Sequence, residues 1–344
     1  MSLLPLPPSN LLYIALRRLC SFEMKMERAT KRIRDDEGSQ GGEYQRGEVW
    51  YEDGNVVLIA EGTTFRVHRG VLSQRSDAFR DMFAVISGSQ PVDAEMWEGC
   101  PVVHLSDRKY ELKHMLTALY DGKQYFNVRA KLDLVVASTM LQLGMKYQID
   151  DIKQEAIECL SYRFPSRLGY FADLAKGVSY KHIIPIVALA WKFELYDILP
   201  VAFYWCSQMS VDELIHGWVD EHGTQWRLSP EDQARCLKGL STLRLQCIKE
   251  WAFLLHGKPT ERCADREGCE SRIAKFGVKY LDGTFPHTET PLTHWWSMSL
   301  PRDCQLCRSC MDEVQRQFNK GRIEAWNALP TTFGISNLVQ WTIE

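Results

Sequence analysis

The stretch from Asp53 to Phe83 constrains the fold of this chain more than any other, because its apolar spacing changes there from strand-like to helix-like. Apolar residues fill positions 56–60, which is typical of a largely buried strand. Gly62 offers the positive φ that a tight turn needs, and alternation resumes at Phe65 and Val67. The segment therefore predicts two strands joined by a tight turn and followed by helix.

The helical part of this stretch shows spacings of four, four, three and four. These spacings separate His68, Leu72, Ser76, Phe79 and Phe83. Ser76 and Asp77 offer an N-cap in front of a second helix. We expect His68 to be structural, because no Cys, Asp or Glu stands at metal-ligand spacing from it.

The following residues alternate between loop, strand and helix signals. Residues 87 to 100 are polar and contain Gly and Pro, so they predict a loop. A short strand is expected over 102–105, followed by a helix that stops at Gly122. Apolar residues at helical spacing predict two more helices, over 132–147 and 152–164. A few short strands with a group of helices indicate the α+β class.

Taken together, the residues from Asp53 to Phe83 resemble the start of a BTB/POZ domain, of the type common in basidiomycete (mushroom-forming) fungi. The resemblance implies a short mixed sheet capped by helices. It also implies protein–protein binding without enzymatic activity, and self-association as a homodimer or larger homo-oligomer. Residues 44–50 would then supply an edge segment for β-augmentation. Candidate interaction residues are Trp50, Phe65 and Leu72.

Composition shifts divide the chain into four parts. We expect a disordered leader over 1–47, a BTB/POZ core over 48–128, a helical extension over 129–255 and a loop-rich segment over 256–344. The extension resembles the BACK region of larger BTB proteins in its position and helix content. The last part is rich in Cys and Trp.

Charge and apolar content exclude several classes of protein. The chain has 344 residues, a formal net charge of −3 and a pI near 6.3, which disfavours general binding to nucleic acid or anionic membrane. No apolar run is long enough to cross a bilayer. We expect an intracellular protein of the nucleus or cytoplasm, with reduced cysteines. Residues 31–34 resemble a minimal nuclear-import signal, and the alternative is a solvated tail.

Five cysteines of the last part carry the only pattern typical of inorganic chemistry. They are Cys263, Cys269, Cys304, Cys307 and Cys310. A C-x-x-C pair can bind one metal ion from a single turn, and a second pair would complete a tetrahedral zinc site. The region around Leu306 and Cys307 resembles fungal BTB proteins that carry a comparable pair of Cys and then a distant C-x-x-C. The resemblance therefore implies Cys263, Cys269, Cys307 and Cys310 as ligands, with Cys304 as the alternate. His256 and His287 are substitutes, and ordinary buried or free thiols are the alternative interpretation.

Motifs for nucleotide binding, metalloprotease activity and α/β-hydrolase activity are absent from the sequence. We therefore expect a non-enzymatic interaction adaptor. One alternative is a substrate adaptor of a cullin-type ubiquitin ligase, whose family motif would align with Leu112-Lys113-His114, although His114 replaces the expected Glu. A second alternative is a transcriptional regulator, which the acidic balance disfavours.

Overall fold

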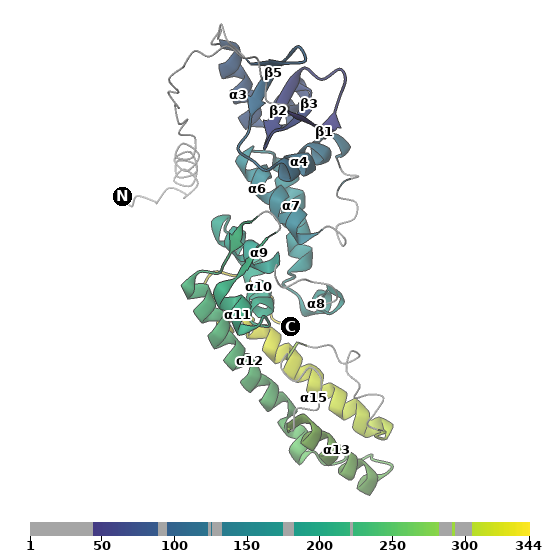
Figure 1. Ribbon diagram of the computed structural model, residues 1–344. Helices are drawn as coiled ribbons and strands as arrows, with labels where there is room; N and C mark the ends of the chain where they lie inside the picture. The colour runs from purple at the N-terminus through teal and green to yellow at the C-terminus, as the bar shows by residue number, and fades with distance from the viewer. Residues whose placement is uncertain are drawn as a thin grey trace, which may run out of the picture. The chain divides into compact units, whose positions relative to one another are not determined.

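The computed structural model describes eight ranges of the chain and two compact units (Figure 1). The described residues are 44–88, 95–122, 125, 133–174, 182–220, 223–281, 291–292 and 305–344. The first unit combines residues up to 120 with 143–151, and the second combines 121–142 with 152–344. Most of the leader expected over 1–47 lies outside the described residues, and regular structure begins at Gln45.

The first unit is built on a five-stranded sheet of order β1-β3-β2-β5-β4. Its strands are β1 (Gln45–Trp50), β2 (Val56–Ala60), β3 (Thr63–Val67), β4 (Met96–Trp97) and β5 (Cys100–His104). Strand β1 runs parallel to β3, β2 is antiparallel to β3 and parallel to β5, and β4 is antiparallel to β5. The sheet is therefore mixed, with β1 and β4 at its two edges.

The predicted hairpin forms where the alternation places it. Leu58 of β2 pairs with Phe65 of β3, and every residue of β2 is buried. The turn residues Glu61 and Gly62 both have positive φ, of 47° and 74°. Only Gly62 was expected there, because a non-glycine residue seldom adopts this region of the Ramachandran plot. β4 was also not expected, since we predicted residues 87 to 100 to be a loop.

Three helices follow the strands of the first unit: α2 (Arg69–Arg75), α3 (Asp77–Gly88) and α4 (Lys109–Asp121). The hydroxyl of Ser76 accepts a hydrogen bond from the N–H of Phe79 at 3.0 Å and donates one to the carbonyl of Tyr147. The predicted N-cap of α3 is therefore present, and it also ties this helix to residues 143–151.

His68 sits at the corner between β3 and α2 and is held by hydrogen bonds. Its backbone N–H donates to the hydroxyl of Tyr120 at 2.8 Å, and its ring Nδ1 lies 3.0 Å from the same oxygen. Its Nε2 lies 3.2 Å from a carboxylate oxygen of Asp53. The ring of Tyr51 stacks on that of Tyr120 with centroids 4.3 Å apart. These contacts match the structural role that we expected for this histidine.

Helices make up most of the rest. Helices α6 (Leu134–Lys146) and α7 (Asp150–Arg163) contribute residues to both units. The other elements of the second unit are α8 (Leu168–Leu174), α9 (Ile183–Lys192), the short 3₁₀ helix η3 (Tyr196–Ile198), α10 (Leu199–Cys206), α11 (Val211–His216), β6 (Trp218–Val219), β7 (Gln225–Trp226), α12 (Pro230–His256), α13 (Arg266–Leu281), α15 (Arg308–Asn327) and α16 (Leu329–Thr332).

The second unit has an aromatic core that joins α8 to α15 and to Trp341. Trp326 of α15 is fully buried, and its ring lies 5.3 Å from that of Phe171 in α8 and 5.0 Å from that of Trp341. The indole N–H of Trp341 donates to the carbonyl of Trp326 at 3.1 Å. The half-buried Trp341 therefore packs against the core of this unit.

The part of the chain from residue 256 onward differs from the loop-rich segment that we expected. Its described residues are mostly helical, in α13, α15 and α16. Helix α15 buries a row at intervals of four residues, made of Cys310, Val314, Phe318, Arg322 and Trp326, with Gly321 and Ala325 buried beside it. Because Cys and Arg occupy two of the five positions in this row, the apolar periodicity of this helix is weak in the sequence.

None of the helices in the described ranges combines the length and the apolar character needed to span a membrane.

Candidate functional site

The first half of the candidate metal site is the start of α13. Cys263 lies just before this helix and is half-buried, whereas Cys269 lies in its first turns and is fully buried. The carboxylate of Asp265 accepts a hydrogen bond from the N–H of Gly268 at 3.1 Å. This side chain caps α13, and the cap fixes the direction in which the helix leaves Cys263.

The second half is the start of α15. Cys307 is its N-cap residue, and Cys310 lies in the first turn with an exposed fraction of 1%. The carbonyl of Cys307 accepts the N–H of Met311 at 2.9 Å, which is the first helical hydrogen bond. A C-x-x-C pair across a helix start points both sulfurs in the same direction.

The two helix starts bring four sulfurs together. The Sγ atoms of Cys263, Cys269, Cys307 and Cys310, here called the cysteine cluster, all lie within 4.8 Å of one another. The sulfurs of Cys263 and Cys307 are 3.7 Å apart. A zinc ion bound at about 2.3 Å by four thiolates requires sulfur–sulfur distances of about 3.8 Å, so the observed spacing fits a tetrahedral site.

Backbone N–H groups point at two of these sulfurs. The N–H of Cys307 donates to the sulfur of Cys269 at 3.3 Å, and the N–H of Thr260 donates to that of Cys310 at 3.4 Å. Such hydrogen bonds stabilise thiolates and so favour metal binding. The hydroxyl of Thr260 also lies 2.7 Å from that of Ser309, which joins the two halves once more.

Arg272 makes a further connection between the two halves of the site, in addition to the sulfurs. Its Nη1 donates to the carboxylate of Asp265 at 3.0 Å and to the carbonyl of Gln305 at 3.0 Å. The sequence analysis did not identify Arg272 or Thr260. An Arg seven residues after an Asp is a weak signal, and Gln305 is 33 positions from Arg272 in the sequence.

The thiols of Cys307, Cys263 and Cys269 differ in acidity. The N–H groups of Cys310 and Ala264 lower the pKa of the Cys307 thiol to about 6. Partial burial, together with the neighbouring sulfurs, raises the pKa of Cys263 to about 12, and burial also raises that of Cys269. Of these three, Cys307 is the thiol best prepared to meet a metal ion as a thiolate.

The alternate ligands that we considered cannot be compared with the cluster. Cys304 and His287 lie outside the described residues, as does the side chain of His256. The preferred set of four is the one that the structure brings together.

The candidate interaction residues lie mostly inside the first unit. Phe65, Leu72 and Leu112 have exposed fractions of 2%, 0% and 0%, so their side chains are occupied by the core of their own chain. Trp50 and His114 are half-buried. The guanidinium of Arg46 lies 4.3 Å from the centre of the Trp50 ring, which places this pair on edge strand β1.

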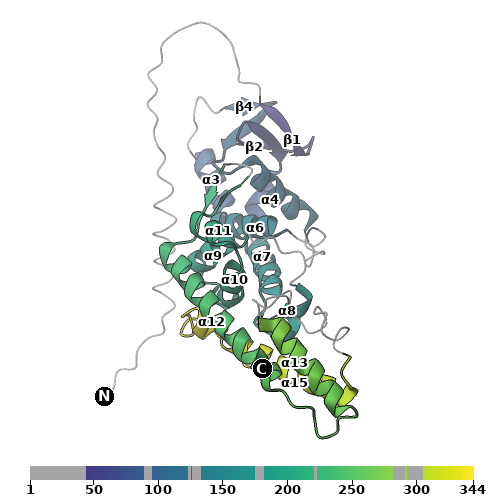
Figure 2. The ribbon, with the colours of Figure 1, turned by 60° about the horizontal axis from the view of Figure 1, so that its bottom comes forward.

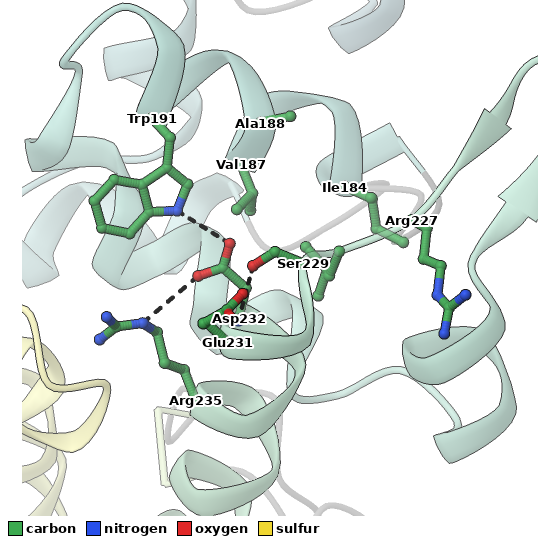
Figure 3. A pocket seen from close by; sticks show the side chains of 10 residues that line it. Ile184, Val187, Ala188, Trp191, Arg227, Ser229, Glu231, Asp232 and Arg235 are labelled. Atoms are coloured by element: carbon green, nitrogen blue, oxygen red, sulfur yellow. Dashed lines mark hydrogen bonds and ion pairs between the residues drawn. The ribbon is translucent and has the colours of Figure 1, made fainter.

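A groove of about 540 Å³ lies between α9 and the start of α12 (Figure 3). At its floor, the indole N–H of Trp191 donates to Asp232 at 3.1 Å, and Nε of Arg235 lies 3.6 Å from the other carboxylate oxygen. Burial raises the pKa of Asp232. Arg235 also donates to the carbonyls of Phe333 and Gly334. These contacts hold the start of α12 in place against α9 and the residues after α16.

A comparison with family models finds a match that covers parts of both units. The family model described as BTB/POZ domain matches residues 51–163. This range includes α6 and α7, which we had placed in the helical extension after residue 128. No curated protein matches the chain.

Proposed function

Because the chain carries a domain of the BTB/POZ family over residues 51–163, we propose that it is a non-enzymatic adaptor that pairs with a second copy of itself and binds other proteins. The domain itself supports a general role in protein–protein interaction. The α+β arrangement, with a mixed sheet and α2 to α4 in the first unit, agrees with this family.

One observation carries the pairing part of the proposal. Of the two edge strands, β1 has six residues and β4 has two. An edge strand offers an unpaired row of backbone N–H and C=O groups to another strand. Strand β1 is long enough for β-augmentation by a second copy, and its Gln45, Arg46 and Glu48 are exposed.

The free side of β1 can be blocked without breaking its pairing to β3. The N–H of Gln45 donates to the carbonyl of Gly62 at 2.9 Å, so the N–H of Arg46 points away from β3. Proline lacks this N–H and is tolerated on the outward side of an edge strand. Arg46→Pro should therefore leave the sheet intact and remove a donor that a second copy would use.

Sedimentation of the full chain tests this proposal. We expect a dimer for the natural protein and for Arg46→Thr, which loses the side-chain contacts of Arg46 but keeps the backbone donor. We expect a dissociation constant at least tenfold weaker for Arg46→Pro. Equal self-association of the two variants would refute pairing through β1.

We further propose that the cysteine cluster holds a structural zinc ion. The spacing of the sulfurs, the N–H groups directed at them and the Arg272 connection support this reading. Zinc would join the starts of α13 and α15, both of which pack against α12. Structural zinc sites contribute an apparent binding free energy of about 10–16 kcal/mol in small domains, enough to order such a junction.

The two alternative functions receive less support. For a cullin adaptor, Leu112 is fully buried and His114 stands where the family motif has a carboxylate. For a transcriptional regulator, the net charge of −3 lacks the positive field that DNA binding needs. A place inside the cell, in the nucleus or cytoplasm, fits the described cysteines, none of which forms a disulfide.

A further inference from the structure

Helix α12 has one face that packs inside the second unit. Cys236, Leu243, Cys247 and Leu254 have exposed fractions of 0%, 2%, 1% and 2%. They face α10, α13, α15 and α16, which pack against this helix. Figures 1 and 2 show α13 and α15 on the same side of α12. The core of the unit therefore occupies one side of this 27-residue helix.

A second set of small and apolar residues runs along another side of α12. This set, here called the apolar stripe, consists of Ala234, Leu237, Ser241, Leu245, Ile248 and Ala252. Leu237, Leu245 and Ile248 have exposed fractions of 38%, 59% and 53%. Three exposed branched apolar side chains on one helix are unusual on a surface that only contacts water.

The spacing of the apolar stripe is that of a helix-pairing seam. Its members are separated by three, four, four, three and four residues. The first three spacings make one 11-residue repeat, and the last two begin a second one. At about 100° per residue, the members lie within an arc of about 80°. An 11-residue repeat corresponds to about 3.67 residues per turn and keeps a seam almost straight along the helix. The stripe spans about 27 Å at about 1.5 Å per residue.

Cations predominate along the stripe, and the acidic residues of α12 (Glu231, Asp232 and Glu250) stand near its two ends in the sequence. Between Gln233 and Lys249 the helix contains four cationic residues and no carboxylate. Lys238 and Lys249 are exposed on one flank of the stripe, and Arg244 is exposed on the other. Arg235, the fourth cation, is held by Asp232 and two carbonyls and does not face the stripe. The surface is therefore a narrow apolar seam with basic borders.

We propose that the apolar stripe of α12 is a docking surface for an acidic amphipathic helix of about five turns. Leu and Ile of the stripe would pack against the apolar face of that helix, and its carboxylates would meet Lys238 and Lys249. This surface lies in the second unit, and all of α12 follows the BTB/POZ match. The proposal does not depend on the one made for the edge strand β1.

Charge and shape favour this occupant over two others. A second copy of α12 would place basic borders against basic borders, which is repulsive at short distance. A membrane surface prefers a wide apolar face with aromatic residues, whereas the stripe is narrow and its six positions hold none.

Two synthetic peptides test the proposal with the full chain. The first carries leucine at the spacing of the stripe and glutamate at its flanks, and the second has lysine in place of every glutamate. We expect the full chain to bind the acidic peptide at least tenfold more tightly than the basic one. Leu245→Asp with Ile248→Asp should weaken that binding at least tenfold. Val278→Asp is the matched control, because Val278 is 60% exposed on α13.

A charge reversal separates this docking from a general apolar contact. Lys238→Glu with Lys249→Glu should reverse the preference, so that the basic peptide binds more tightly. Three results would overturn the proposal: equal binding of both peptides, stripe-dependent binding of phosphatidylserine vesicles that exceeds peptide binding, or self-association that Leu245→Asp abolishes.

Discussion

The sulfur of Cys307 lies 3.7 Å from the sulfur of Cys263, although the two residues are 44 positions apart in the chain. This distance is too long for a disulfide bond, whose sulfurs lie about 2.05 Å apart, and it fits one edge of a tetrahedral zinc–thiolate site. Two helix starts that pack on α12 thus meet at one point.

Cys307→Ser should remove zinc from the protein. Backbone N–H groups lower the pKa of its thiol to about 6, and its sulfur lies 3.7 Å from that of Cys263 on the other half, so the oxygen that replaces it would leave three ligands. We expect about one zinc per natural chain by elemental analysis and less than a tenth of that in the variant.

Cys247→Ala is the control for this experiment. Cys247 is buried on α12 and lies outside the cluster, so the variant should keep its zinc. A chelator should lower the unfolding temperature of the control and leave that of Cys307→Ser unchanged. A natural protein purified under reducing conditions with no bound metal would contradict the assignment.

Gly239→Ala should destabilise the second unit, although alanine favours helix. A Cβ atom at position 239 would lie 2.2 Å from Cε1 of Phe333, so α12 and the residues after α16 could not approach as they do. Overpacking of this kind costs about 1–3 kcal/mol. Chemical unfolding measures the effect.

Gly169→Ala is the matched change in an open position of the same unit. Apart from its chain neighbours and the backbone of its own helix, nothing lies within 4 Å of a Cβ at position 169, so the variant should match the natural protein or gain up to about 1 kcal/mol. Opposite signs for the two variants are the expected result, and equal losses would show that the close approach at Phe333 is not the cause.

Ser76→Ala should destabilise the first unit by about 1–3 kcal/mol, because it removes an N-cap and a buried hydrogen bond together. Ser138→Ala in α6 is the control: its hydroxyl bonds only the local carbonyl of Val135, and the change should cost less than about 0.5 kcal/mol. Equal losses in urea unfolding would mean that Ser76 does not tie α3 to Tyr147.

The pH dependence of stability should reveal the burial of Asp232. Burial raises its pKa above the ordinary value of 3.8, so folding favours the protonated acid. The free energy of unfolding of the natural protein, relative to Asp232→Asn, should be highest below the ordinary pKa. It should fall as pH rises through the raised pKa of the folded state. Urea unfolding of both proteins from about pH 4 to about pH 7 measures the difference. A difference that grows with pH would contradict the burial argument.

Local patterns predicted the parts of the fold that depend on neighbours in the sequence. The alternation from Val56 to Val67 predicted the hairpin, and Ser76 predicted the cap of α3, because strand spacing and capping act over a few residues. The choice of Cys307 and Cys310 over Cys304 came from the resemblance of that region to related fungal proteins.

Features that depend on distant parts of the chain could not be predicted. Strand β1 pairs in parallel with β3 although β2 lies between them in the sequence, and the spacing of apolar residues does not indicate this pairing. The Arg272 connection to Gln305 and the exposure of Leu237 have the same origin. Leu237 has the spacing of a core residue, and only the positions of α13 and α15 around α12 show which of its faces is covered.

Native mass spectrometry of the full chain at micromolar concentration tests the central claim most directly, since it reports how many chains and metal ions one particle contains. The account predicts a particle of twice 39.8 kDa with one zinc ion per chain. A single chain without metal at every concentration would contradict it.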